Sequence, residues 1–523
     1  MTRCVSASFR DKQFTPWRAD AENPGARQTD KDLTMTLPQV PILPILPELI
    51  LTLFGIAVML FDPFTAKSHK SWLSTLAFIG VLAALGGNVL LLTGEGEYYN
   101  GLIIVDSFSL FFNFLFLIIA GLSILVSRQY LVREGVNHSE YYALLLFATV
   151  GMCFMGGANE LIMIFIGLEI TSISTYVLAG FRRTDLKSNE AAIKYFLLGS
   201  FATAFLLYGI ALTYGATHTT HLSQISSALL TGRIDLRLVL AGTALMMVGF
   251  SFKVATAPFQ IWTPDVYEGA PIPITGWMSV GPKAAGFAAF LRVFFVALPA
   301  LDQKWFWVLW VSAVLTMTIG NTAAMLQSNI KRMLAYSSIA HAGYILVAFA
   351  ALTPNGIASI LFYLLAYSVM NLGAFAVISA WSLSGERRVT IDEFAGLGYR
   401  HPWLAAAFTV FLLGLTGIPL TAGFTGKFFM FRAAINSKLY WLTLIALLNS
   451  AASLYYYLRP TIAMYMRDPG EPGRAPAPED AAPLQISMAT KMVIVVSVLA
   501  VFYLGLFPSA ILDFAQSSAF LAR

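Results

Sequence analysis

The stretch that decides the fold runs from residue 253 to residue 283 and reads KVATAPFQIWTPDVYEGAPIPITGWMSVGPK. Its end residues, Lys253 and Lys283, each lie inside a long apolar segment. A lysine at the centre of a bilayer costs roughly 2.5–3.5 kcal/mol on insertion scales, so it is rarely retained without a role. The prolines between the two lysines remove backbone donors and interrupt a helix. The stretch therefore predicts a broken membrane helix beside a line of buried charge, for which protons are the natural cargo.

Composition supports a membrane protein. The chain has 523 residues, of which 57% are hydrophobic and 12% charged, whereas a soluble protein carries about 25% charged residues. The net charge of +5 is small for this length and does not indicate nucleic-acid binding. Two cysteines are too few for an iron–sulfur cluster, and no zinc spacing, dinucleotide fingerprint or Walker A motif is present. We therefore expect no cofactor or metal in this chain, and any transport must draw on an ion gradient or on partner subunits.

Apolar segments of about 20 residues predict about fourteen membrane helices. Lysine and arginine gather in alternate loops, which places those loops in the cytoplasm and both chain ends outside. Residues 1–37 contain no such segment and are expected to be a disordered extension or a mis-assigned start, followed by a transmembrane domain over 38–515. The predicted helices lie near 44–62, 72–93, 102–126, 140–157, 160–180, 191–214, 236–259, 272–298, 305–326, 332–352, 355–381, 402–429, 439–464 and 490–513.

Two of these helices, the seventh and the twelfth, are predicted to be broken. GFSFKVATAPF (249–259) in the seventh matches GLTGIPLTAGF (414–424) in the twelfth, about 165 residues later. Breaks at membrane depth survive only where they are buried or line a wet cavity. Five helices lie in each matching unit, and an odd number inverts the topology. The pattern therefore predicts two inverted five-helix repeats, at about 140–300 and 305–465, as in transporters.

Ionisable residues inside apolar segments are the candidate proton carriers. The distance between Glu169 and a lysine would set the proton affinity of that lysine, and a histidine titrates near neutral pH. Each residue also has a structural alternative: a buried salt bridge for the glutamate, a cap on freed carbonyls for Lys253, or simple hydrogen bonding for His341. Asp265 and Glu268, at the inner mouth, are expected to shape a loop. The full candidate set is Glu169, Lys194, Lys253, Lys283, His341 and Lys427.

PFQIWTPDVYEGAPIPITGWMSVGPKAAGF (258–287) and NIKRMLAYSSIAHAGY (329–344) resemble subunit N of the proton-translocating NADH–quinone oxidoreductase, respiratory complex I. This antiporter-like family is related to Mrp sodium/proton antiporters. The resemblance covers roughly 38–515, and PDVYEGAP followed by PK is typical of the subunit N branch. It implies an all-α polytopic fold with about fourteen helices, two inverted repeats and broken seventh and twelfth helices.

The resemblance also implies roles for the candidate residues. Glu169 matches the fifth-helix glutamate, Lys194 the sixth-helix lysine and Lys253 the lysine of the broken seventh helix. Lys283 matches the eighth-helix lysine, His341 the tenth-helix relay histidine and Lys427 the twelfth-helix lysine. Together they would form a proton relay.

The function implied is that of a translocase subunit in the bacterial inner membrane, without a redox centre of its own. Its partners would be neighbouring antiporter-like subunits, small proton-channel subunits and membrane lipid, with no nucleic acid. FMN, iron–sulfur clusters, NADH and quinone would belong to other subunits. Two alternatives stay open: an Mrp-type cation/proton antiporter subunit, and a structural spacer whose buried charges only pack helices. A stand-alone symporter for sugars or amino acids fits poorly, because the titratable line is rich in lysine.

Overall fold

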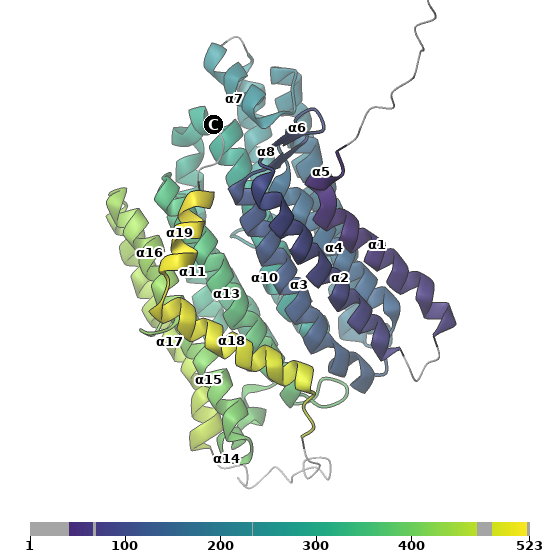
Figure 1. The fold of residues 1–523 in the computed structure, drawn as a ribbon. Helices are drawn as coiled ribbons and strands as arrows, with labels where there is room; N and C mark the ends of the chain where they lie inside the picture. Colours follow the sequence, from purple (N-terminus) through teal and green to yellow (C-terminus); the bar gives the residue numbers. More distant parts are fainter. Residues whose placement is uncertain (1–40, 66–69, 233, 468–483, 520–523) are drawn as a thin grey trace, which may run out of the picture. The chain divides into compact units, whose positions relative to one another are not determined.

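The computed structural model describes residues 41–65, 70–232, 234–467 and 484–519. The extension predicted for 1–37 lies outside these residues. Almost all of the described chain is helical, and the long helices form a bundle (Figure 1). The first ten helices are α1 (Leu46–Phe61), α2 (Ser71–Leu90), α3 (Ser107–Arg133), α4 (Ser139–Gly157), α5 (Leu161–Ala179), α6 (Leu186–Thr217), α7 (Leu222–Thr231), α8 (Leu236–Val254), α9 (Trp262–Gly269) and α10 (Ile272–Arg292).

The second part of the described chain continues the pattern of long helices joined by short turns. It contains α11 (Asp302–Met325), α12 (Ile330–Phe349), α13 (Pro354–Trp381), α14 (Leu397–Arg400), α15 (Pro402–Thr416), α16 (Ala422–Asn436), α17 (Tyr440–Met466), α18 (Met488–Leu506) and α19 (Ser509–Ser518). Single 3-10 turns lie at Leu43–Ile45, Asp62–Phe64, Leu91–Thr93, Pro299–Leu301 and Ile391–Phe394, and a π turn at Val293–Ala297 extends α10.

Twelve of the described helical segments are long and apolar enough to cross a membrane. The other two predicted segments correspond to α12 and to the pair α15 and α16. The count of fourteen therefore stays a prediction, as do the inverted repeats and their bounds. The all-α membrane architecture itself is confirmed.

The predicted start of the third helix is wrong. Ile103–Val105 form strand β2, which pairs antiparallel with β1 at Gly96–Tyr98. The helix begins only at Ser107, because the Asp106 carboxylate accepts a 2.7 Å hydrogen bond from the backbone N–H of Ser109 and caps the first turn. Apolar strand residues at the head of an apolar helix had hidden this boundary.

Both predicted breaks are present. α8 ends at Val254, four residues before Pro258, because a proline ring clashes with the carbonyl four residues earlier. Ala255 then takes a left-handed φ of +60°, and the chain resumes as the short helix α9. In the twelfth segment, α15 ends at Thr416, Gly417 takes a φ of +93°, and α16 begins at Ala422.

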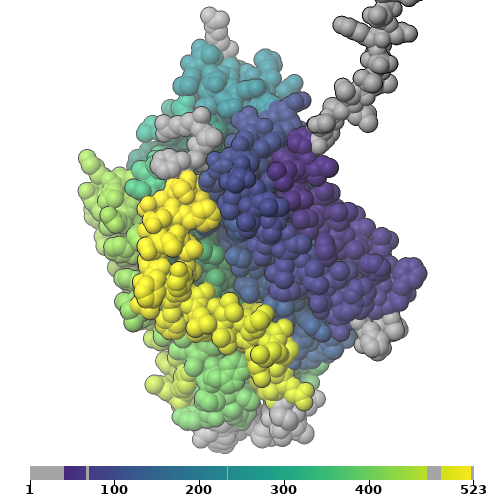
Figure 2. Space-filling model, viewed as in Figure 1, coloured from purple at the N-terminus to yellow at the C-terminus, as the bar shows by residue number. Residues whose placement is uncertain are grey.

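The centre of the described bundle is built from α10, α12 and α13. The most apolar windows of α10 and α13 are 89% and 94% buried. α10 packs against α3 and α13, and α12 against α13 and α16. Near the C-terminal end, α18 and α19 pack across α3 and α13, so they lie over the junction between early and late helices (Figures 1 and 2).

Candidate functional site

Lys253 occupies the last turn of α8, directly before the first break. Its side chain is 5% exposed, and its Nζ donates to the hydroxyl of Ser172 on α5 at 2.9 Å. The alternative that this lysine caps carbonyls freed by the break is not what the geometry shows. The break leaves its ammonium facing another helix.

Glu169 lies on α5, one turn before Ser172. One of its carboxylate oxygens, Oε1, is buried without a hydrogen-bond partner in the described protein, and no ion pair within 4.0 Å joins it to Lys253. A cavity of about 10 Å³ lined by Ser172, Tyr176 and Lys253 lies alongside, and this volume accommodates about one water molecule. Lys253 is therefore joined to α5 through Ser172, and no salt bridge closes between Lys253 and Glu169.

Lys194 lies in a different environment. Its ammonium pairs with Glu190 at 2.6 Å and with Asp265 of α9 at 2.7 Å, and its side chain is 40% exposed. Arg332 of α12 binds both Asp265 and Glu268, at 2.8 and 3.0 Å. The structure thus places Lys194 in an ion-pair cluster at α9. Asp265 and Glu268, which were expected to shape a loop, lie within this helix.

The charges of this cluster perturb the two carboxylates of α9. For Asp265, burial acts to raise the pKa, but hydrogen bonds from Lys194 and Arg332 outweigh it and lower the pKa below its ordinary value. For Glu268, burial opposes hydrogen bonds from Lys187 and Arg332, and the pKa is again lowered. Both groups therefore remain anionic well into the acid range.

Lys283 lies at the centre of α10 and is 2% exposed. Its Nζ donates to the backbone carbonyl of Ser338 on α12 at 2.7 Å and also to the hydroxyl of that serine. Ser338 lies one turn before His341 on the same helix. The second lysine and the histidine are thus brought to one short segment of α12.

His341 is 1% exposed and held on both ring nitrogens. Nδ1 bonds the hydroxyl of Tyr363 on α13, and Nε2 bonds the hydroxyl of Tyr457 on α17 at 2.9 Å. The rings of Tyr344 and Tyr367 pack against the imidazole, with centroids 5.6 and 5.1 Å away. Sequence analysis missed these tyrosines, although all lie in apolar segments: Tyr363 and Tyr367 in YLLAYS, Tyr457 in YYYL and Tyr344 in AHAGY.

Lys427 on α16 binds the second break. Its Nζ donates to the carbonyls of Leu415 and Thr416 at 3.0 and 2.8 Å, and to Ser450 Oγ on α17 at 3.0 Å. The same ammonium lies 4.8 Å above the ring of Tyr344, which also touches His341. Hence Lys427, and not Lys253, caps the carbonyls that a break sets free.

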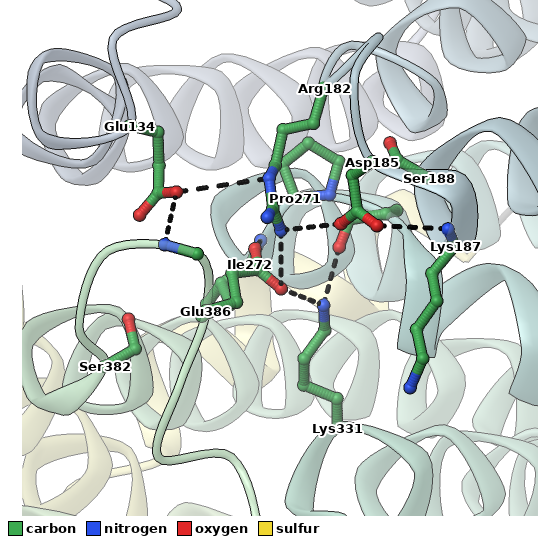
Figure 3. Close-up of polar contacts among 12 residues, drawn as sticks. Glu134, Arg182, Asp185, Lys187, Ser188, Pro271, Ile272, Lys331, Ser382 and Glu386 are labelled. Atoms are coloured by element: carbon green, nitrogen blue, oxygen red, sulfur yellow. Dashed lines mark hydrogen bonds and ion pairs between the residues drawn. The ribbon is translucent and has the colours of Figure 1, made fainter.

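A second set of buried charges, which sequence analysis overlooked, is centred on Glu386 (Figure 3). Its carboxylate lies 2.6 Å from the Lys331 ammonium and 3.5 Å from the Arg182 guanidinium. It also accepts from the backbone N–H of Ile272 at 2.8 Å, while Lys331 donates to the Ala270 carbonyl at 2.7 Å. This pair therefore clamps the junction between α9 and α10. The sequence placed Glu386 in a polar loop, with no signal of burial.

Two further buried charges also escaped sequence analysis. Glu48 in α1 is 6% exposed, and its Oε2 has no partner among the described residues. Arg292 at the end of α10 holds Asp106 through two hydrogen bonds of 2.9 Å. Both residues lie in or beside apolar segments. The criterion that selected the six candidates, an ionisable residue inside an apolar segment, would therefore have selected these two as well.

The comparisons with known proteins decide the family. A family model described as NADH:quinone oxidoreductase/Mrp antiporter, TM, matches residues 158–453. NADH-quinone oxidoreductase subunit N of Trichlorobacter lovleyi is 49% identical over 478 residues, which cover 91% of this chain and 96% of that protein. The chain belongs to the subunit N family of NADH-quinone oxidoreductases. A second subunit N, from Solibacter usitatus, is 48% identical over 474 residues, 91% of this chain and 96% of its own.

Solved structures show the same fold. A chain of respiratory complex I from Thermus thermophilus with bound aureothin matches with a TM-score of 0.75 and 35% identity, over 90% of this chain and 99% of that chain. A chain of the Mrp complex from Dietzia sp. matches with a TM-score of 0.79 but only 21% identity, over 92% and 97%. The Mrp likeness shows the fold alone. The predicted family is confirmed, whereas the roles of the six residues stay predictions.

Proposed function

We propose that this member of the subunit N family provides one proton path through the membrane arm of an NADH–quinone oxidoreductase in the bacterial inner membrane. NADH oxidation and quinone reduction in partner subunits drive the transport. FMN, the iron–sulfur clusters and the sites for NADH and quinone belong to those subunits. Within the described residues no three His, Cys, Asp or Glu side chains gather as a metal site would require.

The observation that carries the proposal is a set of three buried ammonium groups without counter-ions. Lys253, Lys283 and Lys427 are 5%, 2% and 4% exposed, and none forms an ion pair with a described residue. A cation buried only to pack helices is expected to have a carboxylate partner, because an unpaired buried charge is costly. Lysines that take up and release protons, in contrast, are expected to lack a carboxylate partner.

The proposed route runs from the first break to the second. Protons enter from the cytoplasm near Glu169 and Lys194 and load Lys253, whose affinity depends on the glutamate. They then pass to Lys283 and through Ser338 to His341, and leave past Lys427. The contact of Lys283 with Ser338, the tyrosine bonds of His341 and the Tyr344 ring beneath Lys427 support the second half of this order.

Replacing Lys253 with methionine in the assembled complex tests the proposal. We expect NADH-driven proton translocation in proteoliposomes to fall roughly tenfold or more, since a positioned proton carrier contributes about 10²–10⁴ to a rate. Lys438→Met, at an exposed lysine outside the proposed route, is the matched control and should translocate nearly as the parent does. Normal translocation by an intact Lys253→Met complex would leave the structural-spacer function as the better account.

A further inference from the structure

A hollow of about 590 Å³ opens between α8 and α11, in a wall that is almost wholly apolar. Its sides are formed by residues spaced three and four apart on each helix, including Ala244 and Val248 on α8 and Val308 and Val311 on α11. Trp307, Val308 and Val311 are 63%, 53% and 47% exposed in the described chain. An apolar patch of this kind marks a binding surface or a contact with membrane.

The hollow arises from the first break. Ser312 donates to the carbonyl of Ala257 at 2.8 Å, and the N–H of Ala257 donates to Thr316 at 2.8 Å. These bonds fix α11 to the break, and the small side chain of Ala244 higher on α8 leaves the space between the two helices unfilled. Ala257, Pro258 and Phe259 line the inner end of the hollow.

The length of the groove matches one leaflet. The α8 wall runs from Leu240 to Ser251 and the α11 wall from Lys304 to Leu315. At 1.5 Å per residue each wall is about 16 Å long, and half of a bilayer hydrocarbon core is about 15 Å. The groove thus has the length of one leaflet and runs from the first turns of α8 and α11 to the break. A spanning helix of another subunit would have to run past that end, whereas an acyl chain of one leaflet fits it.

Two cations lie at the mouth of the groove. Lys304 lines it, and Arg237 lies one turn before Leu240 at the start of α8. Both side chains are exposed, and neither has a hydrogen-bond or ion-pair partner among the residues described. The nearby carboxylates of Asp235 and Asp302 accept from backbone N–H groups in the first turns of the two helices. Trp307, at the same level, is a residue type that settles at the headgroup region.

We propose that this groove binds an anionic phospholipid, with its acyl chain between α8 and α11 and its phosphate at Lys304 and Arg237. The chain end packs on Pro258 and Phe259, so the lipid fills the lipid-facing side of the seventh-helix break. The site is independent of the proton path proposed above, because its ligand is defined by the groove and its two cations alone.

Photolabelling of the assembled complex tests the site. The complex is reconstituted with phosphatidylglycerol or phosphatidylcholine that carries a photoactivatable group at the end of an acyl chain, and the labelled peptides are mapped by mass spectrometry. We expect phosphatidylglycerol to label the α8 and α11 peptides in preference to other exposed helices. Each cation contributes about 1 kcal/mol near a membrane surface, so Lys304→Gln and Arg237→Gln should each lower this label about fivefold.

Three further variants keep the test decisive. Ala244→Trp fills the groove and should abolish the label, whereas Leu499→Trp, on the exposed face of α18, should leave it unchanged. Lys438→Gln removes an exposed lysine elsewhere and is the charge control. Equal labelling by both lipids, insensitive to Lys304 and Arg237, would mean ordinary solvating lipid and overturn the proposal. Cross-links from a helix of another subunit in place of lipid would overturn it as well.

Discussion

The three buried lysines differ in the number of acceptors that hold each ammonium group. In the described structure Lys253 has one acceptor, the Ser172 hydroxyl, whereas Lys283 has both the carbonyl and the hydroxyl of Ser338. A lost hydrogen bond costs about 0.5–1.5 kcal/mol when another acceptor remains, and about 1–3 kcal/mol when a buried polar group is left without one. Lys253 should therefore be more sensitive than Lys283 to the loss of its serine hydroxyl.

Serine-to-alanine substitutions test this difference. We expect Ser172→Ala to slow NADH-driven proton translocation by roughly tenfold and Ser338→Ala by only a few-fold, in line with those two costs. The measurement is acidification of proteoliposomes at equal complex content. Similar rates for the two variants would show that the acceptor count does not control the lysines.

The cluster around Asp265 makes a prediction about acid. A carboxylate whose pKa is lowered in the folded protein contributes stability above its unfolded pKa and loses it only as the pH falls through the folded value. For Asp265 and Glu268 these folded values lie below the ordinary 3.8 and 4.5. Acidification from pH 7 to pH 5.5 should therefore leave the contacts of Lys194 and Arg332 intact.

Asp265→Asn removes the same charge at neutral pH. We expect this variant to show, at pH 7, the lower thermal stability that the parent complex reaches only in strong acid, as read from the temperature at which the subunit dissociates. A parent complex that loses the same stability between pH 7 and pH 5.5 would contradict the lowered pKa of Asp265.

At the scale of helices, glycine and proline in the sequence predicted which membrane segments break. They did not predict where, because the end of α8 depends on a clash four residues before Pro258. They also did not reveal the hairpin of β1 and β2, since Ile103, Ile104 and Val105 read equally well as helix in an apolar run. Helix existence follows from apolar length, whereas boundaries follow from local caps and clashes.

The second break depends on Gly417. Its φ of +93° is one that side chains avoid, and an added Cβ would lie 3.1 Å from Cδ of Lys427. We expect Gly417→Ala to lower stability by about 1–2 kcal/mol, the cost of the left-handed conformation for a residue with a side chain, and to displace Lys427.

Thermal dissociation and proton translocation of the Gly417→Ala complex are the measurements. Gly86→Ala is the control, because this helical glycine faces open space and alanine should be neutral or stabilising there. Equal behaviour of the two variants would show that the break does not require glycine.

At the scale of the molecule, the clamp of Lys331 and Glu386 joins parts that lie far apart in sequence. Glu386 touches α12 through Lys331, the α5–α6 loop through Arg182 and the start of α10 through Ile272 (Figure 3). The buried lysines could be predicted because a charged residue stands out in an apolar stretch of sequence. The clamp could not be predicted, since Glu386 is buried only by elements that the fold brings to its loop.

Breaking the clamp on one side should be worse than removing it. A buried pair that loses one partner costs about 3–5 kcal/mol, whereas removal of both is often nearly neutral. We expect Lys331→Met and Glu386→Gln each to lower the dissociation temperature of the subunit, and the double variant to regain part of the loss. The exposed pair of Arg467 and Asp392 is the control, worth about 0–1 kcal/mol. Strictly additive effects in the buried pair would contradict the clamp.

The three buried lysines share one feature: each has a serine hydroxyl among its partners, at Ser172, Ser338 and Ser450. An ammonium has three donors and no acceptor, but a neutral amine has a lone pair that must meet a donor. Backbone carbonyls cannot supply one. A hydroxyl can, because it turns from acceptor to donor by rotating one hydrogen. Each serine hydroxyl can therefore hydrogen-bond its lysine whether that lysine is charged or neutral.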